Sequence, residues 1–276
     1  MKSAFPAAKW LLLAGLSMAS GSALAINCAK AATPAEKLIC SDKKSLAADA
    51  ELNRAYQAIL KQAPDGDIRA MLVASQKRWV EARDEALGHL TSDPDALPDD
   101  KTAGEIARDL IANRTAQFKE RSKGSATPAM IERAVQQQQF LGQFTGGKYA
   151  GYWTSCDMLP QDYGHYDCFA TRHYQNNDRI CSVDEYWASG TVYTKRYVAN
   201  LVGGKPQVVA SCSFNNSDEA CASVGDIRAR WNPQPAQPTD VYASEPLPKI
   251  DGEIDASDDF DWVKACLTEP AYPAAR

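Results

Sequence analysis

The sequence predicts an α+β protein, in which a domain of antiparallel helices precedes a disulfide-bonded, β-rich domain. Aromatic residues mark the change, because only five of the 24 Phe, Trp and Tyr residues precede position 140. The first half is rich in Ala, Lys, Glu, Gln and Leu, which favour helices. The second half is rich in Tyr, Trp, Thr, Gly, Ser and Asn, a composition typical of strands joined by turns.

Residues 1–25 have the features of a secretory signal peptide. Lys2 and Lys9 precede or flank a short apolar run that begins at Trp10, and the Ala-Leu-Ala sequence at 23–25 is a cleavage signal. We therefore expect export to the periplasm and a mature chain that begins at Ile26. The apolar run is too short to span a bilayer comfortably, and no cysteine follows the cleavage site directly. A soluble protein without lipidation or membrane attachment is expected.

The mature chain divides at a Gly-rich stretch. We assign residues 26–140 to the helical domain, 141–148 to a linker and 149–276 to the β-rich domain. Glycine weakens both helices and strands, so a cluster of it suits a junction. No internal repeat is present.

Capping signals and apolar periodicity place the helices. The Thr-Pro-Ala-Glu sequence at 33–36 is a capping box with proline at the first helical position. Apolar residues at three- and four-residue spacing predict helices at 46–63 and 68–86. Another helix is marked by Ile106, Leu110, Asn113 and Phe118, and a last one is expected at 130–139. The four consecutive glutamines at 136–139 are typical of a solvated helix face or of the lead into a linker.

Strand composition appears at 149–154 and 166–174. The clearest hairpin signal is the pair of β-rich runs 195–202 and 205–214, which surround Gly203-Gly204. Two glycines at that point suit a primed two-residue turn.

The C-terminal segment is first proline-rich and then acidic. Five prolines within 232–248 exclude a central strand or a long helix there. Six acids follow within 251–261, and carboxylates of this kind could bind calcium or complement a basic protein. The order of a calcium loop is lacking, so we favour a solvated acidic segment. A short amphipathic element at 262–267 then returns Cys266 to the β-rich domain. The six acids are Asp251, Glu253, Asp255, Asp258, Asp259 and Asp261.

An even number of cysteines behind a signal peptide predicts disulfide bonds. Spacing does not choose among the 105 pairings that eight cysteines allow. We expect the six cysteines after residue 149 to pair among themselves. The eight are Cys28, Cys40, Cys156, Cys168, Cys181, Cys212, Cys221 and Cys266.

Little in the sequence points to catalysis, to a cofactor or to a metal. No nucleophile elbow, phosphate-binding loop, dinucleotide fingerprint or zinc-protease motif occurs. His165, His173 and the nearby cysteines could in principle ligate zinc, but their spacing matches no zinc-finger pattern. We therefore expect a protein that is not an enzyme and has no metal site.

The charge balance bears on the partner. Without residues 1–25 the chain has 28 Lys and Arg against 35 Asp and Glu, because the leader contains two Lys and no acid. Nucleic-acid binders need the opposite sign to contact phosphates. A net charge of −7 instead suits a cationic protein partner.

Residues 28–87 carry a set of fixed points in a recognisable order. Cys28 and the run at 33–40 (Thr-Pro-Ala-Glu-Lys-Leu-Ile-Cys) are followed by Leu46, Asp49, the Glu-Leu-Asn at 51–53 and Tyr56. Gln76, Trp79, Arg83 and Asp84 form a Q-x-x-W-x-x-x-R-D ending. This region resembles the N-terminal domain of the LprI family. The resemblance implies an envelope-associated inhibitor of lysozyme.

We expect structural roles for the single residues of this set, rather than contact with a partner. Tyr56 and Trp79 lie on apolar stripes and are expected in the core, while Arg83 and Asp49 can form an ion pair that fixes helix packing. Gln76 and Asp84 are taken as structural with them. Family members commonly have a further cysteine after the Arg-Asp pair, which this chain lacks at 85–87. By that comparison, Cys28 pairs locally with Cys40.

We expect a periplasmic binding protein that inhibits lysozyme or a related peptidoglycan hydrolase. The alternatives are an immunity protein against a delivered wall-degrading toxin, and a structural or sensing module of the envelope. If Cys156 and Cys168 pair, the bridge pre-organises the eleven residues between them for contact with the partner. The expected contacts are Tyr163, His165, Tyr166 and Asp167. The alternative is that this loop is only a stapled connection.

Overall fold

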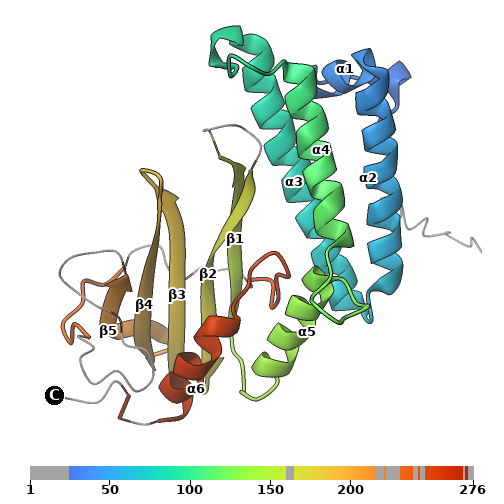
Figure 1. Cartoon of the computed structure of the whole chain (residues 1–276). Helices are drawn as coiled ribbons and strands as arrows, with labels where there is room; N and C mark the ends of the chain where they lie inside the picture. Colours follow the sequence, from blue (N-terminus) through green and yellow to red (C-terminus); the bar gives the residue numbers. More distant parts are fainter. Residues whose placement is uncertain are drawn as a thin grey trace, which may run out of the picture.

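The computed structural model describes residues 25–159, 165–214, 221, 231–238, 242, 246–269 and 271–272. Helices occupy the chain up to residue 141 and a five-stranded antiparallel sheet follows, which confirms the predicted fold class. Figure 1 shows the long helices packed side by side at one end of the molecule and the sheet at the other. Within the described residues, no helix is long and apolar enough to cross a bilayer.

The helices begin where the sequence supplies caps. Thr33 and Glu36 form the predicted capping box of α1, and Thr102 and Glu105 form a second one at the start of α4. Asp65 caps α3, because its side chain accepts a hydrogen bond from the N–H of Ile68. The helical elements are α1 (Pro34–Ser41), α2 (Lys43–Gln62), α3 (Gly66–Ser92), α4 (Ala103–Lys119), α5 (Ala129–Leu141) and α6 (Phe260–Thr268).

The five strands follow one another across the sheet in chain order, so every neighbour is a hairpin partner. Gly203 and Gly204 have φ values of 59° and 75°, as a primed turn between β4 and β5 requires. The expected hairpin is therefore confirmed, but β3 was not foreseen. The strands are β1 (Gly151–Met158), β2 (Tyr166–Asn176), β3 (Arg179–Ala188), β4 (Thr191–Val202) and β5 (Lys205–Phe214).

One face of the sheet is closed by α6, the amphipathic element expected at 262–267. Trp262, Val263 and Leu267 pack there against a core that includes Tyr174 and Val198. In Figure 1 this helix crosses the lower part of the sheet. On the other face, a smaller cluster around Ile180 and Tyr197 packs with Tyr149 and Tyr242.

All eight cysteines are paired. Cys28 bonds Cys40, which confirms the pairing implied by the family resemblance. The other six pair among themselves, as expected for the β-rich region, and Cys181–Cys266 ties α6 to β3. The remaining bridges are Cys156–Cys168 and Cys212–Cys221.

The helical core is shared with the C-terminal half of the chain. Met158 of β1 and Ile250 are buried in the same hydrophobic cluster as Trp79 and Leu110. Phe140, near the end of α5, is buried instead in the cluster under α6 and stacks on Phe260 at a centroid distance of 4.1 Å. The helices and the sheet are thus joined by apolar contacts in both directions.

Candidate functional site

Several of the residues that carry the LprI resemblance line one pocket. It has a volume of about 420 Å³ and lies between α1, α2, α3 and the segment that precedes α1. Tyr56 and Trp79 are buried, as expected for core residues. The pocket is lined by Ala25, Ile26, Asn27, Glu36, Asp49, Leu52, Asn53, Tyr56, Gln76, Val80 and Arg83.

The expected ion pair between Arg83 and Asp49 is not formed. Arg83 instead binds its neighbour Asp84 with Nη2 at 2.6 Å, and its guanidinium stacks over the Trp79 ring. Asp49 accepts a hydrogen bond from the backbone N–H of Ile26 at 2.8 Å. The prediction was wrong because an adjacent carboxylate satisfies the guanidinium locally, while a backbone donor from the N-terminal segment reaches Asp49.

Asn113 is exposed, and its neighbour Arg114 lies on the buried face of α4 instead. The Arg114 guanidinium donates to Gln76 Oε1 at 3.2 Å and to Ser75 Oγ at 2.6 Å, both from α3. It also lies over the rings of Phe118 and Tyr166. Hydrophobic periodicity does not reveal such an arginine, because its long stem packs as an apolar residue while its head is satisfied elsewhere.

The two ends of the predicted contact loop are held together at Cys156 and Cys168, which we call the loop base. Cys156 and Cys168 are register partners on β1 and β2 as well as disulfide partners. His165 and Asp167 are exposed, and Tyr166 is half-buried with its ring under Arg114. Tyr163 lies outside the described residues. The structure thus brings together three of the four residues, but one of them faces inward.

A cleft of about 720 Å³ lies between α4 and this base. Its floor includes Trp79 and Leu110, and its rim carries His165 and Asp167 on one side and Lys119 on the other. Apolar floor with polar rim is the usual composition of a protein-binding hollow. Its full lining is Trp79, Leu110, Asn113, Arg114, Ala116, Gln117, Lys119, Glu120, His165, Tyr166 and Asp167.

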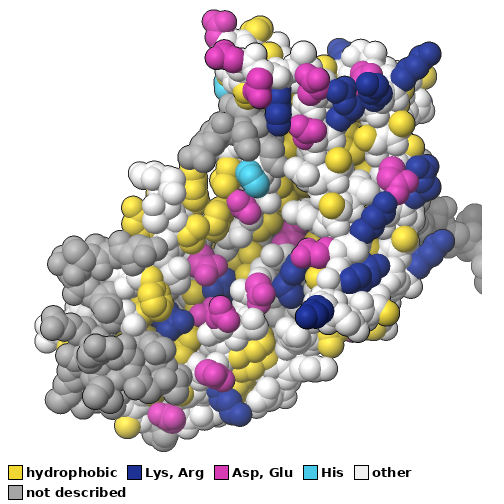
Figure 2. All heavy atoms as spheres, viewed as in Figure 1, with side chains coloured by type: hydrophobic (Ala, Val, Ile, Leu, Met, Phe, Trp, Pro, Cys, Tyr) yellow, Lys and Arg dark blue, Asp and Glu magenta, His cyan; other side chains and the backbone are white. Residues whose placement is uncertain are grey.

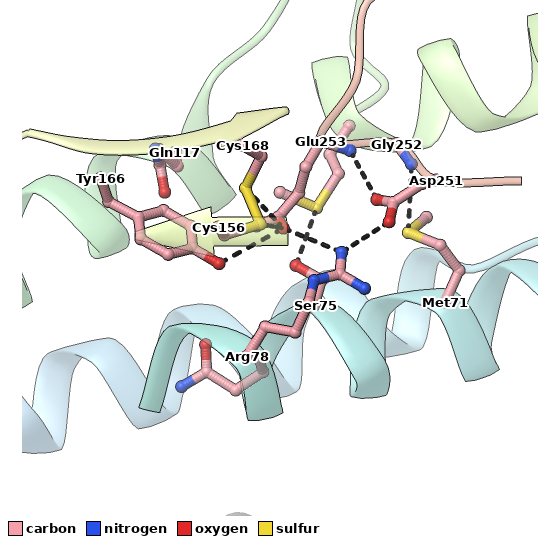
Figure 3. Close-up of polar contacts among 12 residues, drawn as sticks. Met71, Ser75, Arg78, Gln117, Cys156, Tyr166, Cys168, Asp251, Gly252 and Glu253 are labelled. Carbon is pink, nitrogen blue, oxygen red and sulfur yellow. Dashed lines mark hydrogen bonds and ion pairs between the residues drawn. A yellow bond between two sulfur atoms is a disulfide. The ribbon is translucent and has the colours of Figure 1, made fainter. Parts of the chain in front are cut away.

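Below the cleft, the acidic segment after Pro248 forms what we call the tail clamp: Asp251, Gly252 and Glu253 bound by α3, α4 and α5. Figure 3 shows Glu253 pointing toward Arg78, Tyr166 and the Cys156–Cys168 bridge. Glu253 binds Arg114 at 2.6 Å and Arg78 at 3.0 Å, and Arg78 also binds Asp251 at 2.6 Å. The disulfide sulfurs lie 3.2 and 3.5 Å from Glu253 Oε2, and because they have no proton these are contacts rather than hydrogen bonds.

Backbone groups complete the tail clamp. Gln137 on α5 donates to the carbonyl oxygens of Asp251 and Ile254 and accepts from the N–H of Asp251. A side chain at Gly252 would collide with the carbonyl oxygen of Met130, so the turn passes too close to α5 for any other residue. The prediction of a solvated face was therefore wrong for Gln137, which is buried.

Burial and charge act in opposite directions on the two carboxylates. Burial alone would raise the pKa of Glu253, but the guanidinium groups of Arg114 and Arg78 outweigh it and lower the pKa below its ordinary value. For Asp251 burial prevails over Arg78, and its pKa is raised. Burial also raises the pKa of the Tyr166 hydroxyl, so this group stays protonated at neutral pH.

A second buried acid holds α6 on the sheet. Asp259 binds Arg172 of β2 at 2.7 Å and Arg196 of β4 at 3.1 Å, and it accepts from the Trp262 indole at 3.0 Å. Asp255, Asp258 and Asp261 are exposed. The expectation of a solvated acidic segment was wrong for Asp251, Glu253 and Asp259, because each neutralises arginines of distant elements.

The same region contains a possible metal-ligand set. Ligand atoms of Cys156, Cys168 and Glu253 lie within 4.8 Å of one another. A disulfide sulfur is not a thiolate, however, and the carboxylate is already bound by two guanidinium groups. This chemistry suits an internal structural contact rather than a metal ligand.

The family comparison covers the helices that make the pocket and one wall of the cleft. Residues 28–138 match the model of the family named lysozyme inhibitor LprI. This confirms the resemblance and extends it past residue 87, through α4 and into α5. Neither curated proteins nor solved structures gave a match to the chain. The sheet and α6 lie outside the matched LprI region.

The surface of the LprI region has no field of one sign on the face that Figure 2 shows. Basic and acidic side chains alternate there over the helices, and hydrophobic side chains reach the surface in the hollow between the helices and the sheet.

Exposed aromatic residues on the sheet were not foreseen as a candidate surface. The exposed Tyr186 of β3 stacks on the half-buried Tyr193 of β4 at a centroid distance of 5.4 Å, next to the tight turn at Ser189-Gly190. Trp153 on β1 is 55% exposed. The aromatic enrichment after residue 140 was visible in the sequence, but only strand register shows which rings face outward.

Proposed function

We propose that this protein is an exported inhibitor of lysozyme or of a closely related peptidoglycan hydrolase. The observation that carries the proposal is the match of residues 28–138 to the LprI family, which is a family of inhibitors rather than of enzymes. The leader-like residues 1–25 and the four disulfides support a location outside the cytoplasm. The partner is a protein, and its cationic character follows from the acidic balance of this chain.

We further propose that the partner contacts the loop base at Cys156–Cys168 and the adjoining cleft. The disulfide and the strand pairing hold the base in one geometry, which lowers the ordering cost of binding. His165 and Asp167 stand at the cleft rim and can exchange hydrogen bonds with a partner's polar groups. Tyr166 supports the base from within through Arg114 and Glu253.

The test is inhibition of peptidoglycan clearing by a purified lysozyme, with the mature protein added at increasing ratios. We expect activity to fall in proportion to the protein added, and calorimetry to show a one-to-one complex that weakens as salt is raised. Full lysozyme activity at a large excess of the protein would contradict the proposal. Clearing by the protein without lysozyme would indicate a hydrolase instead.

The contact surface is tested by the double variant His165→Ala/Asp167→Ala, with Tyr186→Ala/Tyr193→Ala as a matched control on another exposed hairpin. We expect the first to weaken binding by about tenfold or more, or roughly 1.4 kcal/mol. The control should bind as the parent does. The opposite ranking would assign the contact to the β3–β4 hairpin. Far-ultraviolet circular dichroism and non-reducing mass analysis confirm that both variants are folded and bridged.

A further inference from the structure

The N-terminal segment of the described chain is fixed more firmly than a terminus usually is. The side chain of Asn27 accepts from the N–H of Ala29, and Cys28 is bonded to Cys40 of α1. Ile26 packs its side chain against the helical core, while Ala25 is exposed. The backbone therefore turns into the pocket of family residues at Ile26.

The backbone nitrogen of Ile26 contacts a carboxylate in this pocket. It lies 2.8 Å from Asp49 Oδ2, and Asp49 is buried at 7% exposure. In the uncut chain this nitrogen is a neutral amide with one N–H. Cleavage after Ala25 would turn it into an α-ammonium group with three N–H donors and a positive charge.

We propose that the pocket of family residues is a binding site for the α-ammonium group of Ile26, created when the leader is removed, and that Asp49 is its counter-ion. This inference rests on the proposed export with cleavage after Ala25. It gives a role to Asp49 that neither the expected pair with Arg83 nor a contact with lysozyme supplies.

The pocket has the charge and the acceptors that an ammonium group needs. Glu36 and Asp49 face it from α1 and α2 and Arg83 faces it from α3, while the only other titratable group in its lining is the phenol of Tyr56. Arg83 is bound by Asp84 outside this set. The lining has two carboxylates and one guanidinium that Asp84 already neutralises, so an ammonium group would meet an excess of negative charge there.

An unsatisfied acceptor lies in the same pocket. The Asn53 Oδ1 atom is buried and has no hydrogen-bond partner in the described part of the chain, although Asn53 lines the pocket with Ile26. Buried polar atoms without a partner are uncommon, since each costs about 1–3 kcal/mol. The amide of Ile26 has no further proton for it, whereas the ammonium has two.

The experiment compares three forms of the purified chain. One begins with a free Ile26, one has the same residue Nα-acetylated, and one keeps Ala25 as its first residue. The acetylated form retains the N–H that binds Asp49 but lacks the positive charge and the two further N–H donors, which makes it the matched control. At pH 7 we expect the free form to have the highest midpoint of thermal unfolding, by several degrees, with the other two nearly equal.

The pH profile gives the second readout. An α-amino group ordinarily titrates near 7.7–8.0, and the charge of Asp49 raises its pKa in the folded chain. The added stability is then complete below about pH 7.7 and is lost as the pH rises through the raised folded value. We expect the free and acetylated forms to converge above about pH 10.

The variant Asp49→Asn is the third readout. In it, the higher unfolding midpoint of the free form over the acetylated form should disappear. Equal stability of the free and acetylated forms at pH 7 would overturn the proposal, and so would an advantage that survives Asp49→Asn. If that variant does not fold, the comparison of the free and acetylated forms still decides, since it leaves Asp49 intact. Lysozyme inhibition is measured separately, so failure of the proposed function leaves this result unaffected. Mass analysis of exported material that begins at a residue other than Ile26 would overturn the inference for the cell.

Discussion

The pocket of family residues and the tail clamp both bury a carboxylate beside α3, but they bind it with different groups. Asp49 receives one backbone N–H from a segment 23 residues away, whereas Glu253 faces two guanidinium groups from helices more than 130 residues away. The first closes the helical region on itself. The second fastens the C-terminal segment, the sheet and the helices together.

The difference shows how polar burial can serve local and long-range order in one molecule. In the pocket of family residues, loss of the Asp49 carboxylate would loosen α1 and the N-terminal segment. In the tail clamp, loss of the Glu253 charge would leave Arg114 without a counter-ion in a low-dielectric interior and Arg78 with Asp251 alone, which costs far more. Gln76 connects the two clusters, because it lines the pocket and accepts from Arg114 of the clamp. The predictions below separate the contributions of the two regions.

The largest effect is expected for Glu253→Gln. It retains the shape of the side chain but leaves Arg78 and Arg114 without their shared counter-charge, and breaking a buried pair in this way costs about 3–5 kcal/mol. The free energy of unfolding in urea measures it. Asp255→Asn is the control, because Asp255 is exposed and should change stability by less than about 0.5 kcal/mol. Equal losses in the two variants would show that the clamp adds nothing.

Removing the Cys28–Cys40 bridge should have the next largest effect. The double variant Cys28→Ser/Cys40→Ser opens a loop with a sequence separation of 12, which lowers stability by about 2–4 kcal/mol. The loss should be confined to the N-terminal segment and α1. Hydrogen exchange resolved by residue is the measurement, and faster exchange in the sheet as well would mean that the two regions are not separate.

Gln137→Ala tests the tail clamp without changing a charge. It leaves backbone groups of Asp251 and Ile254 without their partner, and we expect a loss of about 1–3 kcal/mol. Gln136→Ala is matched to it within the same run of glutamines, and Gln136 is exposed. A thermal scan of both variants suffices. If they shift equally, the contacts of Gln137 do not stabilise the fold.

The smallest expected effect is a decrease in the free energy of unfolding at acidic pH. The folded pKa of Glu253 lies below its ordinary value of 4.5, so its contribution is present above that pH and is lost as the pH falls through the lowered folded value. Urea unfolding between pH 6 and pH 3 should therefore show a decline that is shallower in Glu253→Gln. A parallel decline in parent and variant would assign the acid sensitivity to other carboxylates.

Residues near one another in sequence made much of the fold predictable. The capping box at Thr33 and Glu36, the Gly203-Gly204 turn and the amphipathic element around Trp262 each depend on a few adjacent positions, and each is present. Turn residues bound β3 at Asn177-Asp178 and Ser189-Gly190, but its buried and exposed residues do not alternate, so periodicity did not reveal it.

The candidate site was predictable only in part. The family residues were recognised from their order, and the loop between Cys156 and Cys168 was a prediction conditional on their pairing, but the inward position of Tyr166 depends on Arg114 and Glu253. Those partners lie 52 and 87 residues away in sequence. No local pattern distinguishes a tyrosine that will find them from one that faces solvent.

From the sequence by itself we predicted the helices, four of the five strands, and the family resemblance of residues 28–87 with the Cys28–Cys40 pairing that it implied, because caps, turns and motifs act over a few residues. The tertiary structure alone decided which acids are buried. Asp251 meets Arg78 across 173 residues, and Asp259 meets Arg172 across 87. A carboxylate is stable in the interior only when a cation is brought to it, and only the folded chain brings these cations there.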